Sequence, residues 1–401
     1  MKHSRNFYHL FFSQLFANTG DIIYIVGLIS FVYQLTGKAT SAGTIPIVIT
    51  AGIFLSGILS PYIYQRLSKQ RVLLIFQMLK IVILIGILAF ISVSITELIY
   101  LYLLIFINSL FDGFTNPIKN SFIPYIEKEE HILSANAKMN TMNNVVQVGS
   151  WALGGILLAA LGYSNLIILT IVLYIFAVIF TLFIKDDKQV ETEAETMMGS
   201  FHNMIKTNLK TPWSRFLNIS TFIESFAHSV WIAAVILIYV ETFLQVDTFW
   251  FGMINATFFT GMIIAGLVVN FQDQFFQKRF SFFIFYLPIV LAVLNMSFAI
   301  NHILIFVLLC SCIYGILDEM RTTVLHSKLQ SELNDTQITD TYVLNNMVYS
   351  FSFAISTYLI TVIVDYSGVF WAFIIAGLAY LVVFIVGLKY QHSLTQHNEQ
   401  I

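Results

Sequence analysis

Charged residues are scarce in this sequence. Asp, Glu, Lys and Arg make up 10% of its 401 residues, whereas about a quarter of the residues of a soluble domain are charged. Hydrophobic residues, in contrast, account for 58% of the chain. Such a chain cannot cover its own surface with polar groups. The composition therefore indicates a membrane protein, in which an apolar helix of about 20 residues crosses a hydrocarbon core roughly 30 Å thick.

Cysteines and catalytic motifs are also scarce. The two cysteines, Cys310 and Cys312, fall within one apolar segment, which excludes a secreted-type disulfide framework and favours a packing role. The sequence has no Gly-x-x-x-x-Gly-Lys-Ser/Thr loop for ATP, no His-Glu-x-x-His zinc motif and no Gly-x-Ser-x-Gly nucleophile turn. We therefore expect no enzyme activity, no cofactor and no metal site.

Apolar segments long enough to span a membrane occur in two sets of six. The first set covers residues 7–33, 41–65, 72–94, 97–118, 134–160 and 164–184, and the second covers residues 215–243, 248–271, 279–299, 302–323, 337–364 and 366–389. The first segment follows two basic residues, as a signal peptide does, but it is too long and contains the polar residues Gln14, Asn18 and Asp21. We predict an all-α membrane protein of about 12 transmembrane helices in two six-helix bundles.

The basic residues predict the orientation of these spans, because Lys and Arg collect in short cytoplasmic loops. If the N-terminus is cytoplasmic, the inside loops hold most of the basic residues, including Arg66, Lys69 and Arg71. The opposite loops carry acidic residues such as Glu97 and Asp365. Both termini are therefore expected in the cytoplasm, with the chain as a multi-pass protein of the cytoplasmic (inner) cell membrane.

A polar interval separates the two sets of spans. We predict an N-terminal bundle at residues 1–184, a cytoplasmic linker at 185–214, and a C-terminal bundle with a short cytoplasmic tail at 215–401. The mixed charge of the linker favours a solvated segment. An alternative for Phe201–Leu209 is a short amphipathic helix on the membrane surface.

Short internal similarities suggest that one bundle is a copy of the other. Small residues recur as Gly52 and Gly57 in the second span and Gly261 and Gly266 in the eighth; amides recur as Asn143 and Asn144 in the fifth and Asn345 and Asn346 in the eleventh. This order favours two parallel repeats, related by an axis along the membrane normal.

The stretch from the fourth span through the fifth has further distinctive residues. It contains Asn116-Pro117, Pro124, the acidic run Glu127–Glu130, Ser134-Ala135-Asn136, and Gly154-Gly155 followed by Gly162. In this order of features the chain resembles the major facilitator superfamily, and within it the macrolide-efflux and enterobactin-exporter branch. The resemblance implies a two-bundle fold and the export of a small molecule.

Several positions depart from the pattern of that family. The loop between the second and third spans has Tyr64, Ser68 and Lys69 where family members usually have Gly-x-x-x-Asp-Arg. Asn108 stands in the fourth span where an Arg is common. The loop keeps its positive charge but lacks the carboxylate, so the usual proton-antiport motif is incomplete.

Three acidic residues lie within predicted spans, where a charge costs about 2.5 to 3.5 kcal/mol on insertion scales and normally faces a cavity or a partner. They are Asp21, Asp112 and Glu224, and His228 follows Glu224 by four residues, so that their side chains can meet. One interpretation is that these residues bind a cation or exchange a proton with the aid of His228, whose ordinary pKa is near neutrality. The alternative is that neighbouring polar groups hold each acid and fix helix packing. Lys80, the basic residue within a span, either pairs with an acid or lines a water-filled cavity.

Polar side chains at helical spacing supply further candidates. Predicted to line a cavity are Gln14, Asn18, Asn108, Asn140, Asn143, Asn144, Gln147, Asn345 and Asn346. Their alternative role is hydrogen bonding between helices, at about 0.6 kcal/mol per contact. Predicted to form a cytoplasmic gate are Arg66, Lys69, Arg71, Asp318, Glu319 and Arg321, although the last three also fit a solvated helix end.

These observations favour a secondary active transporter. We expect an ion-gradient-driven, monomeric exporter of a small amphiphilic molecule, such as a drug or a macrolide-like or siderophore-like compound, with protons as the coupling ion. An acidic cavity rich in aromatic side chains suits a hydrophobic cation. The alternatives are transport of an endogenous lipid or metabolite, an intramembrane enzyme, and a transporter-like sensor. Besides the bilayer and the substrate no partner is expected, and in particular no nucleic acid.

Overall fold

The computed structural model describes residues 3–36, 39–93, 97–185, 197–247 and 249–395, and within these ranges the regular structure is entirely helical. In chain order the helices are α1 (Arg5–Thr36), α2 (Ala39–Tyr64), α3 (Lys69–Val93), α4 (Leu98–Ile126), α5 (Glu129–Leu182), α6 (Met197–Lys210), α7 (Pro212–His228), η1 (Ser229–Trp231), α8 (Ala233–Ile238), η2 (Tyr239–Leu244), α9 (Phe249–Phe271), α10 (Asp273–Lys278), η3 (Phe282–Tyr286), α11 (Leu287–Ile300), α12 (Leu304–Glu332), α13 (Asp335–Ser367) and α14 (Val369–Thr395).

Each predicted span overlaps one or more of these helices, which confirms the all-α membrane fold. In the described part of the chain, nine helices are long and apolar enough to cross a membrane. The predicted spans outside this set are residues 134–160, which carry several amides, residues 215–243, which form short helices, and residues 302–323. The last lie in α12, which carries Asp318, Glu319 and Arg321 close together.

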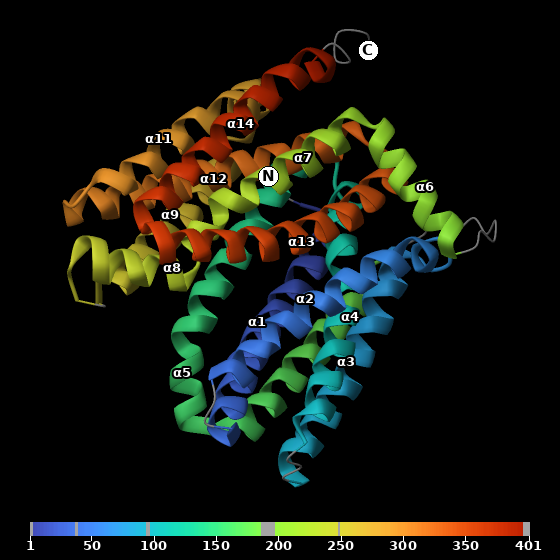
Figure 1. Ribbon diagram of the computed structural model, residues 1–401. Helices are drawn as coiled ribbons and strands as arrows, with labels where there is room; N and C mark the ends of the chain where they lie inside the picture. The colour runs from blue at the N-terminus through green and yellow to red at the C-terminus, as the bar shows by residue number, and fades with distance from the viewer. Residues whose placement is uncertain (1–2, 37–38, 94–96, 186–196, 248, 396–401) are drawn as a thin grey trace. The chain divides into compact units, whose positions relative to one another are not determined.

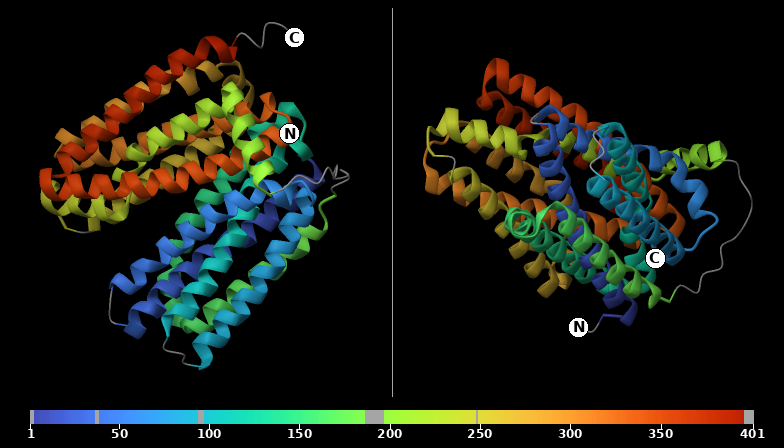
Figure 2. Two further views of the ribbon diagram at one scale, coloured as in Figure 1. Left: turned by 45° about the vertical axis from the view of Figure 1, so that its right-hand side comes forward. Right: turned by 90° about the horizontal axis from the view of Figure 1, so that it is seen from below.

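The helices form two compact units, Met1–Lys128 with Val145–Ile205, and Glu129–Asn144 with Lys206–Ile401. In the first unit α4 packs against α2 and α3, and α1 packs against α2 (Figure 1). Its apolar core includes Leu28, Leu84 and Ile105, which are at most 1% exposed. In the second unit, seen from two further directions in Figure 2, α9 packs against α12, and α14 packs against α7 and α11.

Local sequence explains several helix ends. Pro212 starts α7, where its missing N–H removes no hydrogen bond. Asn334 accepts a hydrogen bond from the backbone N–H of Gln337, whose side chain in turn accepts one from the backbone N–H of Asn334; this capping box starts α13. Gly162 has a φ of 72°, a conformation that suits glycine, and it joins two successive helices within α5.

The predicted seventh span is broken in its middle. Helix α7 ends at His228, a single 3₁₀ turn follows, and Ile232 adopts an extended conformation (φ −68°, ψ 151°) before α8 begins. Discontinuous helices of this kind place backbone groups and helix ends inside a membrane protein, where they are tolerated if other protein groups cover them. Ser229 lies at the break and donates a hydrogen bond to the carbonyl of Ser225, 2.6 Å away.

The described part of the predicted linker is helical, because α6 extends from Met197 to Lys210. This observation favours the amphipathic alternative over a fully solvated segment. One face is buried, with Met204 1% exposed, and the Ser200 hydroxyl hydrogen-bonds Gln65 at 3.0 Å. The acidic residues of the linker from Asp186 to Glu195 lie outside the described residues.

The repeated glycines lie at equivalent helix crossings in the two units. A Cβ atom on Gly52 of α2 would lie 2.7 Å from the carbonyl oxygen of Phe106 in α4. A Cβ atom on Gly261 of α9 would collide with the carbonyl oxygen of Cys312 in α12. Because the colliding atoms belong to the backbone, a side chain at either position requires the helices to move apart.

We expect Gly261→Ala to lower the stability of the protein by about 1 to 3 kcal/mol, because the new methyl group overpacks the crossing of α9 and α12. The matched control is Gly252→Ala in the same helix, where an added Cβ has no neighbour within 4 Å. Thermal unfolding of the purified protein in detergent measures both variants. Equal stability of the two variants would contradict the close approach of these helices.

Candidate functional site

A buried charge centre joins four helical segments of the first unit. Lys80 of α3 is 1% exposed, and its ammonium group donates a hydrogen bond to Asp21 Oδ1 of α1 at 2.7 Å. The same group contacts Asp112 of α4 and the hydroxyl of Tyr174 in the second half of α5, and Tyr174 also donates to Asp21. Lys80 is thus paired with both predicted acids, which decides between the two roles considered for it.

The accessibility of this centre is uneven. The Lys80 side chain is almost completely enclosed, whereas the side chains of Asp21 and Asp112 are 28% and 20% exposed. Both acidic side chains therefore contact the lysine and keep part of their surface accessible. A second cation, Lys119, is half-buried and lies 3.5 Å from Asn18 Oδ1.

Other sequence-predicted polar residues lie on the same helices as the acids of this centre. Gln14 is buried on α1, 4% exposed, and Asn18 lies one turn further along that helix. Asn108 is 1% exposed and precedes Asp112 by about one turn of α4. In the described part of the chain, neither Asn108 Oδ1 nor the hydroxyl of Tyr24, another buried residue of α1, has a hydrogen-bond partner.

The second unit holds a larger charged cluster. Glu224 of α7 forms an ion pair with Arg321 of α12 at 2.7 Å, and Arg321 is only 1% exposed. One turn after Glu224, the His228 Nε2 atom lies 3.5 Å from Asp318 Oδ1 and 3.2 Å from the hydroxyl of Tyr380 in α14. The Tyr380 hydroxyl donates to Asp318 at 2.8 Å. The expected contact between Glu224 and His228 is thus replaced by separate partners for each.

A cavity of about 180 Å³ adjoins this cluster. Its lining includes Glu224, His228, Arg321, His326 and Asn345, together with Thr221. Asn345 donates a hydrogen bond to the Thr221 hydroxyl at 2.7 Å, so this predicted cavity residue is at the cavity wall. Asn346 is half-buried on the same helix, α13.

The interpretation of Asp318, Glu319 and Arg321 as a solvated helix end is wrong. These side chains belong to residues that are 8%, 5% and 1% exposed. The apolar segment stops near residue 323, but α12 continues to Glu332, so the charges lie within the helix. Burial without partners would be costly, and each of the three has a partner on another element.

The amide stripe of α5 forms hydrogen bonds to α12 within the second unit. Asn136 contacts Gln330 at 2.6 Å, Asn140 contacts Thr323 at 2.8 Å, and Asn144 contacts Glu319 at 3.2 Å. For these three amides the contacts favour helix packing over cavity lining. Of the other two predicted amides, Asn143 is half-buried and Gln147 is exposed.

The basic residues of the loop between α2 and α3 have local partners in the first unit. Arg66 stacks over the ring of Tyr62 at 3.5 Å, and Lys69 donates to the carbonyl of Ser121 in α4 at 2.8 Å. Arg71 is exposed. Tyr64, at the start of the altered loop motif, donates to the carbonyl of Phe114 at 2.6 Å. These contacts tie the loop to α4.

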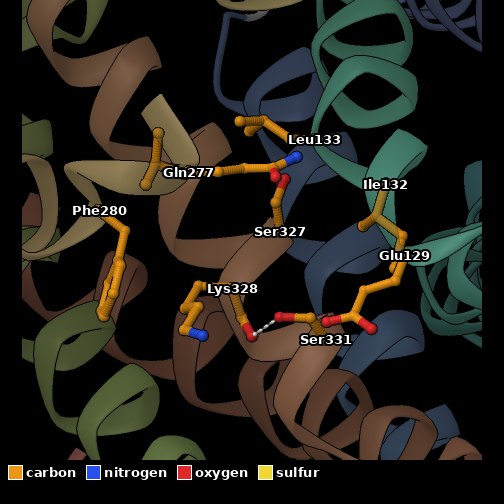
Figure 3. A pocket seen from close by; sticks show the side chains of 9 residues that line it. Glu129, Ile132, Leu133, Gln277, Phe280, Ser327, Lys328 and Ser331 are labelled. Carbon is orange, nitrogen blue, oxygen red and sulfur yellow. Dashed lines mark hydrogen bonds between the residues drawn. The ribbon is translucent and has the colours of Figure 1, made fainter. Parts of the chain in front are cut away.

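A second cavity, of about 230 Å³, opens beside α12 in the second unit (Figure 3). Glu129, Gln277, Phe280 and Lys328 contribute to its lining, and Lys328 is paired with Glu332 of the same helix at 2.5 Å. None of the predicted coupling acids lines it. It is therefore a weaker candidate for the coupling site than the cavity beside Glu224.

Sequence reasoning missed the tyrosines of both centres. Tyr174 and Tyr380 contact acidic side chains in their respective units, and they are 206 residues apart in sequence. Asp112 and Asp318 are separated by the same 206 residues. This shared interval was the sequence signal that could have pointed to the tyrosines. Short matches are common in apolar sequences, however, so the interval alone does not identify contacting residues.

Comparison with known proteins decides the family. A model of the Major Facilitator Superfamily matches residues 10–249, which is more than half of the chain. The chain belongs to the major facilitator superfamily. It is accordingly a multi-pass membrane transporter, of a family that acts on small molecules, and not an enzyme. The resemblance stated from the sequence is thus confirmed at the level of the superfamily.

Relatives of this superfamily match along the whole chain. YfmI and YjbB, two uncharacterized MFS-type transporters of Bacillus subtilis (strain 168), are 28% and 24% identical to it; the alignments cover 98% and 96% of this chain and 99% and 95% of those proteins.

Among solved structures, a bacterial homologue of the iron transporter ferroportin in an outward-facing state has a TM-score of 0.81 at 14% identity, covering 97% of this chain and 100% of that one. The Escherichia coli fucose:proton symporter FucP has a TM-score of 0.73 at 14% identity, covering 96% and 97%. These structures share the fold.

We expect Arg321→Met to destabilise this superfamily member by about 3 to 5 kcal/mol, because it leaves the Glu224 carboxylate buried without its counter-charge. The double variant Glu224→Gln/Arg321→Met should be more stable than Arg321→Met alone, since both charges are then removed. Thermal unfolding in detergent checks both. Strictly additive losses would show that the ion pair has no energetic coupling.

Proposed function

We propose that this chain is a monomeric exporter of the cell membrane that moves a small amphiphilic molecule by alternating access, in exchange for protons. The observation that carries the proposal is a charged cluster in the second unit: Glu224, His228 and Arg321 line a cavity, and Asp318 is paired with His228. Charges inside a membrane protein are costly, and they commonly mark ion or substrate pathways. The finer resemblance to the macrolide-efflux and enterobactin-exporter branch supports the direction of transport.

His228 is the proposed proton-exchanging group. It faces Asp318 of α12 and Tyr380 of α14, while Glu224 on its own helix and Arg321 of α12 share the adjoining cavity. A histidine titrates near neutral pH, whereas the arginine stays charged. Protonation adds a positive charge beside Asp318, and loss of the proton removes it. The charge of the cluster therefore changes by one unit when the transporter takes up or releases a proton.

Glu224 is the proposed coupling acid. Its carboxylate is held by Arg321, which is also fixed by a hydrogen bond from its Nε atom to the carbonyl of Ile284. Protonation of Glu224 removes its negative charge and leaves the positive charge of Arg321 uncompensated. This change favours a rearrangement of the cluster. The solved relative FucP is named as a proton symporter, and its shared fold is compatible with coupling to protons.

The substrate class follows from the first unit. Two partly exposed carboxylates lie beside Tyr174, next to an apolar core that contains Leu84 and Ile87. Acidic groups bordered by aromatic and aliphatic side chains suit a molecule with a positive charge and an apolar body. We propose drug-like, macrolide-like or siderophore-like compounds with these properties.

A susceptibility and efflux panel in a host with and without this chain tests the proposal. We expect resistance to amphiphilic cations, and its loss with Glu224→Gln or His228→Gln, because these changes remove the proton-exchanging charges. The matched control is Glu241→Gln, which alters an exposed acid of η2 and should leave efflux intact. Export in proteoliposomes that persists without a proton gradient and is unaffected by Glu224→Gln would overturn proton coupling. No change for any toxic compound would instead favour an endogenous lipid or metabolite.

A further inference from the structure

In the charge centre of the first unit, acidic groups outnumber the enclosed cation that they contact. The Lys80 ammonium group is held by Asp21, Asp112 and Tyr174, and it also lies 4.4 Å from the centre of the Tyr174 ring. Two carboxylates thus share one enclosed cation. The side chains of Asp21 and Asp112 also remain 28% and 20% exposed.

Two further polar groups in this region have no assigned partner in the described part of the chain. The Tyr24 hydroxyl and Asn108 Oδ1 are buried, and their residues are 3% and 1% exposed. Tyr24 follows Asp21 by three residues on α1, and Asn108 precedes Asp112 by four on α4, so each lies on the same helix face as its acid. A buried polar group without a hydrogen bond costs about 1 to 3 kcal/mol. A ligand that reaches these groups would supply the missing hydrogen bonds and offset this cost.

The chemistry of these groups selects the ligand. Carboxylates, a tyrosine hydroxyl, an amide oxygen and an aromatic face all favour a positive charge. The neighbouring core contains Ala17, Leu84 and Ile87, which favour an apolar body. The Lys80 side chain has the same chemistry as such a ligand, because it is an alkyl chain that ends in an ammonium group.

We propose that Asp21 and Asp112 form the binding site for an organic ammonium ion, and that Lys80 is a tethered occupant which this ion displaces. This assignment rests on the proposed transport function, and it describes how the transporter would bind its substrate. Exchange of one ammonium group for another leaves the charge of the centre unchanged. One ammonium group is therefore paired with the two carboxylates whether or not substrate is present, and an incoming cation binds only by competing with the lysine.

The first test is binding of 3-phenylpropylammonium to the purified full-length protein in detergent, measured by calorimetry without any ion gradient. Lys80→Met removes the competing cation but keeps the alkyl volume. We expect this variant to bind the probe about tenfold more tightly than the wild type, since it no longer has to break the lysine contacts. The control ligand is 3-phenyl-1-propanol, which has the same tail without the charge and should bind equally weakly to both proteins.

A second variant keeps the test decisive if Lys80→Met does not fold. Tyr24→Phe removes a hydroxyl that has no hydrogen-bond partner among the described residues. We expect it to retain or raise the thermal stability but to weaken binding of the ammonium probe severalfold, because the hydroxyl is reserved for the ligand. Tyr100→Phe, at an exposed position of α4, is the matched control and should change neither property.

The outcomes separate this inference from the proposed function. Unchanged or weaker ammonium binding by folded Lys80→Met overturns the tethered-occupant role, and unchanged binding by Tyr24→Phe overturns it where the lysine variant is unfolded. Tighter binding without any proton-driven transport would retain the ammonium site and refute the exporter. Proton-driven transport with no effect of either variant on binding would retain the exporter and refute the ammonium site.

Discussion

A charge inside an apolar helix bundle needs a counter-charge on another helix, and the internal organisation of both units depends on this requirement. Lys80 connects α3 to α1, α4 and the second half of α5 through three side chains. In the second unit, Arg321 and His228 connect α12, α7 and α14 in the same manner. Breaking such a pair leaves a buried charge without its counter-charge, which is costly, so the ion pairs favour one arrangement of the helix faces.

The two units provide counter-charges through equivalent aspartates and tyrosines, but the basic residues that these contact differ. Each unit contains an aspartate in the helix of its fourth span and a tyrosine in that of its sixth, and both pairs of equivalents are 206 residues apart. The crossing glycines Gly52 and Gly261 support the same duplication. The first unit supplies a lysine, which stays charged near neutral pH, whereas the second supplies a histidine, which does not. We infer a division of roles, with substrate binding in the first unit and proton exchange in the second.

The sequence was sufficient for the spans and for the acids within them, because apolar runs and isolated charges are local signals. It was insufficient for their partners: Asp21 and Tyr174 lie 59 and 94 residues from Lys80. It also misplaced the end of α12, since the apolar pattern stops where buried charges begin although the helix continues. The break after His228 had no signal in the sequence, because Ser229–Ile232 contains neither glycine nor proline. These features depend on contacts between helices rather than on local propensity.

Linkage between the two centres is the central claim, because binding of a cation to one unit must change proton binding at the other if transport is coupled. The most direct measurement is proton release from the purified protein in weak buffer, followed with a pH-sensitive dye as 3-phenylpropylammonium is added at neutral pH. We expect protons to be released as the cation binds to the wild type, at most about one per bound cation, and no release from His228→Gln. Cation binding without proton release, or equal release by His228→Gln, would contradict it.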